Sequence, residues 1–215
     1  MQDAICHRWS LSVTSRYRAT VLPDGCRDVI VKLAPNVAPV VFITDLDQSA
    51  YPVDLNPGVV LIGARLTPGA SLDERCLLVD GARDLDLEQV IDRALDAVTM
   101  PEEGVAEALS LFASTPCSVV AAARTLGVSE RTLRRTVTHA TGWPPSRWLA
   151  LARARRCARA LAFDQYPLTE IAVNAGYSDQ AHMTRDMANW FQMTPRQLRG
   201  NASVKNLLSQ PGFGS

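Results

Sequence analysis

The stretch IAVNAGYSDQAHMTR, residues 171–185, has a counterpart about 49 residues earlier in the same chain. Ala172 stands four residues before Gly176, just as Ala123 stands four residues before Gly127. This spacing is typical of a helix-turn-helix unit, in which a small Ala lets the two helices cross closely and Gly accepts a left-handed turn. After each glycine come an apolar or aromatic residue, a serine and a helical pattern, and the second turn is one residue longer. The sequence therefore predicts two such units.

The second helix of each unit is expected to begin at a capping serine, Ser129 or Ser178. Helical spacing turns one apolar set inward: Leu133, Val137 and Ala140 in the first unit, and Met183, Met187 and Trp190 in the second. The residues left outward are Arg131, Arg134, Arg135 and Thr138 in the first, and Gln180, Ala181, His182, Thr184, Arg185 and Asn189 in the second. Arg pairs with guanine, Gln with adenine, and Thr or Ala contacts the thymine methyl, so these side chains are expected to face bases and phosphates in a major groove.

A long helix is predicted between the two units, over residues 146–163, with Pro145 at its start. Its apolar positions line one face, and four arginines occupy much of the remainder: Arg153, Arg155, Arg156 and Arg159. Such a helix would fix the separation of the two units, and arginines along it neutralise phosphates where they reach them. A solvated face is the alternative interpretation of these arginines.

The net charge of zero conceals an asymmetry between the two halves of the chain. Residues 1–115 hold nine Lys/Arg and seventeen Asp/Glu, a net charge of −8, whereas residues 116–215 have a net charge of +8. An asymmetry of this size indicates two domains with different partners, the basic one facing a polyanion.

Composition favours a globular protein of the cytoplasm: 47% of the residues are apolar, 20% are charged, and neither a membrane span nor a signal peptide is expected. The five cysteines are scattered without C-x-x-C spacing, which predicts reduced thiols rather than a disulfide framework or a zinc finger. Cys26 is a candidate effector or redox residue, with a buried thiol as the commoner alternative. Residues 1–115 hold a single histidine, His7, so neither a metal site nor a cofactor is expected.

The first half has the pattern of short strands. β-Branched runs lie within residues 21–33, 39–44 and 58–66, separated by Pro, Gly and Asn clusters, which predicts a small barrel or sandwich. Two amphipathic helices are predicted next. The first would be capped by Asp86 and bury Leu87, Val90, Ile91, Ala94 and Val98; the second would follow Pro101 and bury Val105, Ala108, Leu109 and Phe112.

Residues 116–200 closely resemble the DNA-binding domain of the AraC/XylS family of bacterial transcription regulators. The resemblance rests on GVSERTLRRTV, TGWPPSRWLALARARRCARAL, AGYSDQAHMTRDM and TPRQLR, in that order. It implies two helix-turn-helix motifs joined by a long helix, with base contacts from Arg131, Arg134, Arg135, Gln180, His182 and Arg185. Two residues depart from the family pattern: Gln192 stands where the family usually has Gly, and Asn189 takes a place often held by a basic residue.

The N-terminal stretch, with LPDGCRDVI and IGARLTPGA, is similar to the compact β-domain of one subgroup of these regulators, which implies a cupin-like sensory or association domain. The expected fold class is α+β. It comprises a β-rich, cupin-like N-terminal domain (1–82), a helical connector (83–115), an all-α domain with two helix-turn-helix motifs joined by a long helix (116–200), and a flexible tail (201–215).

The sequence thus predicts a transcription regulator without enzyme activity, which reads two adjacent major-groove segments of double-stranded DNA. The expected DNA contacts are Arg131, Arg134, Arg135, Thr138, Gln180, His182, Thr184 and Arg185, with Arg153 and Arg156 from the long helix. RNA polymerase, an effector of unidentified class and a second copy of the chain are candidate partners. A cupin-like enzyme tethered to DNA and a protein-interaction module with a weak DNA-binding domain stay open as alternatives.

Overall fold

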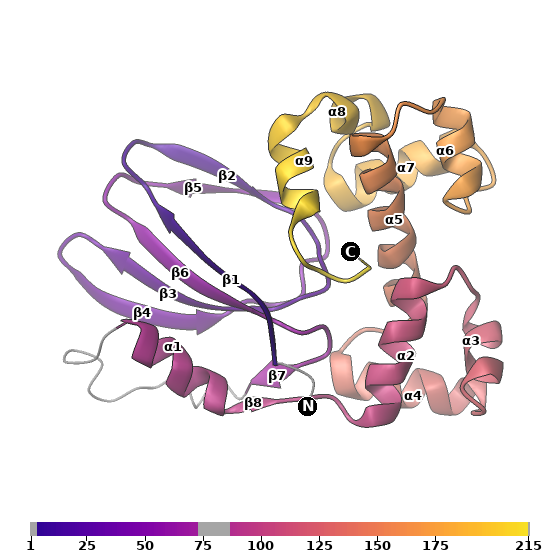
Figure 1. Cartoon of the computed structure of the whole chain (residues 1–215), viewed down its shortest axis with the longest axis horizontal. Coiled ribbons are helices and arrows are strands. Elements are labelled where there is room, and N and C mark those ends of the chain that lie inside the picture. The colour runs from indigo at the N-terminus through magenta and orange to yellow at the C-terminus, as the bar shows by residue number, and fades with distance from the viewer. Residues whose placement is uncertain (1–3, 73–86, 215) are drawn as a thin grey trace. The chain divides into compact units, whose positions relative to one another are not determined.

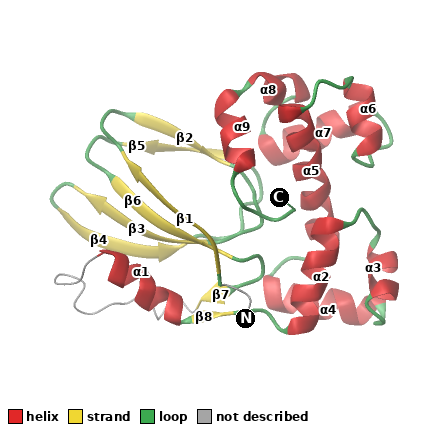
Figure 2. Cartoon of the chain, in the orientation of Figure 1, coloured by secondary structure: helices red, strands yellow, loops and turns green. Residues whose placement is uncertain are grey.

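The computed structural model describes residues 4–72 and 87–214, which form two compact units. The strand unit comprises the described residues of 1–21, 26–46 and 52–101, and the helical unit comprises 22–25, 47–51 and 102–214. Apart from Tyr51 at the start of β5, the described strands lie in the strand unit, and every described helix except α1 lies in the helical unit (Figure 2). The expected α+β class, with a β-rich N-terminal part and an all-helical C-terminal part, is confirmed.

The strand unit is built on a four-stranded antiparallel sheet in the order β1-β6-β3-β4 (Figure 1). Two further pairs, β2-β5 and β7-β8, form separate ladders. The bounds are β1 (Ile5–Ser12), β2 (Tyr17–Val21), β3 (Asp28–Ala34), β4 (Val37–Ile43), β5 (Tyr51–Leu55), β6 (Val60–Leu66), β7 (Ser71–Leu72) and β8 (Val98–Thr99). The three predicted β-branched runs became β3, β4 and β6, three adjacent strands of the main sheet. The cupin-like character of this unit stays a prediction.

One face of the main sheet is covered by α1 (Leu87–Asp96). Val90, Ile91 and Ala94 are buried there against residues of β3 and β6, as their helical spacing predicted. Val98 was expected in the same helix but lies in β8, because the helix ends at Asp96. The predicted cap, Asp86, lies outside the described residues.

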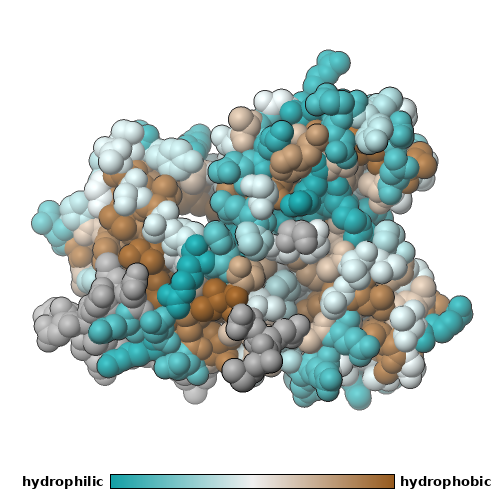
Figure 3. Space-filling model, viewed as in Figure 1, coloured by the Kyte–Doolittle hydropathy of each residue, from teal (hydrophilic) through white to brown (hydrophobic). Residues whose placement is uncertain are grey.

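The opposite face of the sheet carries a half-buried polar cluster. Trp9 Nε1 donates to Asp28 at 2.8 Å, and the Asp28 carboxylate forms an ion pair with Arg65 at 3.3 Å. Gly63 lies opposite Trp9 in the register of β1 and β6, and a Cβ on Gly63 would stand 2.2 Å from the indole ring. In Figure 3, hydrophobic residues gather on parts of the strand unit. The exposed apolar residues of this unit include Val37, Val40 and Phe42 of β4.

The helical unit contains α2 (Glu103–Ser114), α3 (Val119–Thr125), α4 (Glu130–Thr141), α5 (Pro145–Phe163), α6 (Leu168–Asn174), α7 (Gln180–Phe191), α8 (Pro195–Gly200) and α9 (Ala202–Ser209). The four apolar residues predicted to form the buried face of α2 are all buried. Helix α1 belongs to the strand unit and α2 to the helical unit, so the predicted connector is divided between the two.

The expectation of a flexible tail from residue 201 is wrong. Asn201 caps α9 by accepting a hydrogen bond from Val204 N–H at 3.1 Å, and Val204 and Leu208 are buried. Phe213 is 2% exposed and its ring packs edge-on against Trp148, with centroids 4.7 Å apart. The apolar residues after position 201 therefore complete the core of the helical unit.

Candidate nucleic-acid interface

The first helix-turn-helix unit consists of α3, a turn at Gly127 and α4. Gly127 adopts the predicted left-handed conformation (φ 67°), and nearby Ala123 is 3% exposed. The Ser129 hydroxyl accepts a hydrogen bond from Thr132 N–H at 3.0 Å, which confirms it as the cap of α4. The local signals for a turn and a helix start therefore predicted this unit correctly.

The outward face of α4 carries the residues that the sequence placed there. Arg131, Arg134, Arg135 and Thr138 are all exposed. Arg134 is held by Glu130 one turn earlier on the helix, with Nη2 and Oε1 2.6 Å apart. The inward face differs at one position: Leu133 and Val137 are buried, but Ala140 is exposed and Thr141 is buried in its place. The sequence pattern favoured Ala over Thr for the core, whereas Thr141 satisfies its hydroxyl there by donating to Val137 O at 2.8 Å.

The second helix-turn-helix unit consists of α6, a turn at Gly176 (φ 86°) and α7. Five residues separate its helices against four in the first unit, which confirms the longer turn. The extra residue moves the cap. Asp179, not Ser178, accepts the hydrogen bond from His182 N–H at 2.6 Å, so the expectation for Ser178 is wrong. This hydrogen bond lowers the pKa of the Asp179 carboxyl, and the nearby Arg185 adds to the effect.

The outward face of α7 presents two kinds of side chain. Gln180 and Arg185 are exposed. His182 is half-buried: its ring packs edge-on against Tyr177 and its Nδ1 lies 3.1 Å from the Ser178 hydroxyl. Thr184, also half-buried, donates its hydroxyl to Gln180 O at 2.8 Å. The inward stripe of Met183, Met187 and Trp190 is buried, as predicted.

Helix α5 joins the two units and begins at Pro145, as predicted. In Figure 1, α3 and α4 lie toward one end of α5, and α6 and α7 toward the other. Its 19 residues correspond to a helix about 28 Å long. This length is close to the roughly 34 Å of one turn of B-DNA, the separation expected between two recognition helices on one face of a duplex.

The expectation that the four arginines of α5 line an outward face is wrong for Arg155, while Arg153, Arg156 and Arg159 are half-buried. Arg155 is 2% exposed and donates to the carbonyls of Phe213 at 2.8 Å and Pro23 at 3.3 Å. Arg153 forms an ion pair with Asp186 of α7, Arg156 donates to Ala113 O and Arg159 to Leu208 O. Helical spacing could not detect these contacts, because they depend on the helices that pack against α5, among them α2, α7 and α9. Arg153 and Arg156 thus connect helices, and their contact with phosphate stays a prediction that the geometry does not favour.

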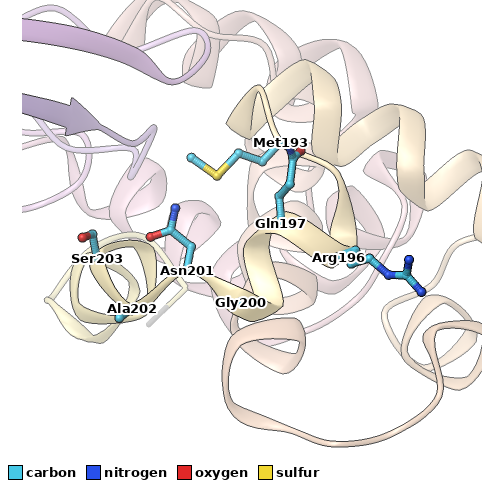
Figure 4. Close-up of a pocket in the computed structure, with 7 residues that line it drawn as sticks. All are labelled: Met193, Arg196, Gln197, Gly200, Asn201, Ala202 and Ser203. Atoms are coloured by element: carbon cyan, nitrogen blue, oxygen red, sulfur yellow. The ribbon is translucent and has the colours of Figure 1, made fainter.

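In the described part of the helical unit, three exposed cations were not predicted from the sequence: Arg124 at the end of α3, Arg196 at the start of α8 and Lys205 on α9. Each of these residues lies on the polar side of a short helix, a pattern from which its exposure could have been predicted. Arg196 also borders an open depression of about 550 Å³ (Figure 4). Figure 4 shows its guanidinium extending away from Asn201 and Ser203 on the other side of the depression, so these polar groups do not converge on one point.

Cys26 is 3% exposed, whereas reactive sensor thiols lie in partially exposed surroundings, so an effector or redox role for Cys26 stays a prediction. Burial raises the pKa of Cys157 on α5 to about 12. Within residues 4–72 and 87–214, no three metal-ligating side chains gather in one place. None of the helices in these ranges combines the length and apolar character of a membrane-spanning segment.

The helical unit is similar to known proteins. Residues 122–201 match the family model of a helix-turn-helix domain. The chain is 37% identical over 106 residues to the HTH-type transcriptional regulator VirS of Mycobacterium tuberculosis, a match that covers 49% of this chain and 31% of VirS. It is 32% identical over 79 residues to the HTH-type transcriptional activator RhaS of Escherichia coli, covering 37% of this chain and 28% of RhaS.

Among solved structures, an AraC-type DNA-binding domain-containing transcriptional regulator from Chromobacterium violaceum is similar. It is 28% identical with a TM-score of 0.42, and the match covers 51% of this chain and 95% of that one. The matched region spans about a third of the length of the curated relatives. Residues 122–201 thus match a helix-turn-helix domain, and the resemblance of this region to the DNA-binding domains of AraC-type regulators is confirmed.

Proposed function

We propose that the chain is a sequence-specific DNA-binding transcription regulator whose helices α4 and α7 enter successive major-groove segments on one face of a duplex. The single observation that carries the proposal is the pairing of two capped helices, with exposed Arg and Gln side chains, at the two ends of one 19-residue helix. The relatives VirS and RhaS, named as a transcriptional regulator and a transcriptional activator, support it. Neither an enzyme nor a pure protein-interaction module is favoured by these relatives.

The side chains assigned to base contact are those on the free outer faces. Arg131, Arg134 and Arg135 on α4 are long, exposed donors of the kind that pairs with guanine O6 and N7. Gln180 and Arg185 take the same role on α7, where Gln pairs with adenine. Thr138, His182 and Thr184 are secondary contacts, since the last two are half-buried and already bonded within α7 or its turn.

The charge of the chain supports a polyanionic partner for this unit. Residues 116–215 have a net charge of +8, and the arginines of α5 that face inward leave the exposed cations on the shorter helices. Binding to phosphates releases counterions, so the affinity should fall steeply with salt concentration. An effector, RNA polymerase and a second copy of the chain remain candidate partners of the full regulator.

The test is selection of binding sites from a random duplex pool with the purified full chain, at two salt concentrations. We expect a site of two short elements about 10 bp apart, centre to centre. Arg134→Ala should then cost on the order of 1–3 kcal/mol and relax one base position in one element. A pool that stays random at both salt concentrations, or an Arg134→Ala loss that is equal on selected and random DNA, would contradict base recognition by α4.

A further inference from the structure

A compact ionic cluster connects the second recognition helix to α5. Arg153 Nη2 of α5 lies 3.1 Å from Asp186 Oδ2 of α7, and Tyr177 in the turn donates its hydroxyl to the same oxygen at 2.8 Å. The Arg153 guanidinium also stacks over the Tyr177 ring, 4.7 Å from its centroid. Three structural elements (the linker helix, the turn and the recognition helix) therefore meet at one carboxylate.

The cluster is shielded enough for these contacts to be strong. The side chains of Arg153 and Asp186 are 30% and 15% exposed, and Tyr177 is 4% exposed. Burial, followed by the charge of Asp186, raises the pKa of Tyr177, so its hydroxyl keeps the proton it donates. A charged hydrogen bond in such surroundings is stronger and more directional than an exposed ion pair, which contributes little.

The first helix-turn-helix unit has no equivalent of this cluster. Helices α4 and α7 both have 12 residues and align at an offset of 50, which places Thr136 at the position of Asp186. Thr136 donates to Thr132 O of its own helix, and Val128 takes the place of Tyr177 after the turn glycine. Instead, α4 is connected to α5 by a buried neutral bond, from Trp148 Nε1 to the Thr141 hydroxyl at 3.0 Å.

The apolar contacts of the two helices differ in stiffness. Helix α4 buries Leu133 and Val137, whereas α7 buries Met183 and Met187 in the corresponding stripe. Methionine has three rotatable bonds and fills irregular gaps, so a methionine stripe tolerates small rotations of the helix that carries it. The orientation of α7 on α5 thus relies on the charged contact between Arg153 and Asp186, whereas α4 combines stiffer packing with the neutral hydrogen bond from Trp148 to Thr141.

We infer that Arg153 and Asp186 are positioning residues for DNA recognition. They hold α7 at one orientation on α5, and they thereby decide whether the second helix can engage its groove while the first is bound. The inference rests on the proposed function, because it concerns the second element of the DNA site. Two linked binding elements gain affinity only when geometry allows both to engage at once.

The test uses the full chain and three duplexes derived from the selected site: both elements intact, the first element alone, and both elements with one base pair added between them. Asp186→Asn keeps an oxygen that accepts from Tyr177 but removes the charge that pairs with Arg153. We expect it to weaken binding to the intact duplex about tenfold, to leave binding to the first element unchanged, and to reduce the penalty for the added base pair.

Two further variants separate positioning from folding. Arg153→Lys keeps the charge without the planar fork, so it should give a smaller loss of affinity with the same pattern across the duplexes. The double variant, Arg153→Lys with Asp186→Asn, should lose no more affinity than Asp186→Asn alone. Asp54→Asn is the matched control, since Asp54 forms an exposed ion pair with Arg18 in the strand unit. It should leave binding to all three duplexes unchanged, and thermal unfolding of every variant reports whether the helical unit is folded.

The outcomes are distinguishable. A loss confined to duplexes with the second element supports the inference. An equal loss on all three duplexes, or no loss for a folded Asp186→Asn, overturns it while leaving the proposed function intact. If the wild-type chain selects no site at all, it is the proposed function that fails.

Discussion

Gln192 takes, at the end of α7, the left-handed backbone conformation that Gly142 takes at the end of α4. The φ angles are 54° for Gln192 and 76° for Gly142, and both N–H groups donate to the carbonyl four residues earlier. Glycine adopts this conformation without a steric penalty, whereas a residue with a Cβ does so at a cost. The departure from the family pattern noted in the sequence therefore leaves the helix end in place and strains one residue.

Replacing this residue should stabilise the helical unit. Gln192→Gly relieves the strain, and after the entropy that glycine adds to the unfolded chain we expect the free energy of unfolding to rise by about 0.5–1 kcal/mol. Chemical denaturation followed by far-ultraviolet circular dichroism measures it. Ala188→Gly, at an exposed interior position of the same helix, should have the opposite sign, with a loss of about 1 kcal/mol. Destabilisation by Gln192→Gly would show that Gln192 is not strained.

The buried Thr141 hydroxyl should be needed to connect α4 with α5. Thr141→Val keeps the shape but leaves the Trp148 indole N–H unpaired in a side chain that has no exposure. The unpaired donor should cost about 1–3 kcal/mol of unfolding free energy. Thr138→Val, on the exposed face of the same helix, should change it by less than about 0.5 kcal/mol. Similar values for the two variants would mean that the indole finds another partner.

In the strand unit, Gly63 should tolerate no larger residue. A Cβ at this position would overlap the Trp9 ring, and moving the ring would break its hydrogen bond to Asp28. We expect Gly63→Ala to destabilise the strand unit by about 1–3 kcal/mol. Gly104→Ala is the control, because nothing lies within 4 Å of a Cβ built there and alanine favours the helix. Thermal unfolding of the two variants should shift in opposite directions.

The cap of α7 should make stability depend on pH. Because the pKa of Asp179 is lowered in the folded state, its contribution is fully present above the unfolded pKa of about 3.9 and is lost as the pH falls through the folded value. Asp179→Asn keeps a capping oxygen without the charge. We therefore expect the wild type to have a higher free energy of unfolding than Asp179→Asn at neutral pH, and this difference should disappear in acid.

The neutral cap of α4 provides the comparison for this experiment. Ser129→Ala should cost about 1 kcal/mol at every pH, because no ionisable group is removed. Denaturant titrations at a series of pH values between 2 and 7 measure both variants. A pH-independent difference for Asp179→Asn would show that the charge of the cap is not involved.

Glu130 should restrain DNA binding by holding Arg134. Glu130→Gln frees the guanidinium and removes a negative charge from the proposed interface, so the affinity for the selected duplex should rise several-fold at low salt and less at high salt. Glu170→Gln makes the same charge change in the first turn of α6 and is the matched control. An equal gain from both variants would indicate a general charge effect rather than the release of Arg134.

The candidate interface was largely predictable because its signals are local. A glycine in a left-handed turn, a capping side chain and the spacing of Leu133 and Val137 each act within a few residues, so the sequence placed α4 and α7 and their exposed side chains. The errors arose where one added residue or one satisfied hydroxyl changed the outcome: Asp179 replaced Ser178 as the cap, and Thr141 replaced Ala140 in the core.

The sequence by itself determined the two helix-turn-helix units, the linker helix and the β-rich character of the first half, because periodicity and turn chemistry specify the elements of secondary structure. Only the tertiary structure decided the strand order β1-β6-β3-β4, the burial of Phe213 after the family match ends, and the roles of the arginines of α5. Whether an arginine meets water, a carbonyl or a carboxylate depends on residues 30 to more than 100 positions away, such as Asp186 and Pro23. No local pattern carries that information.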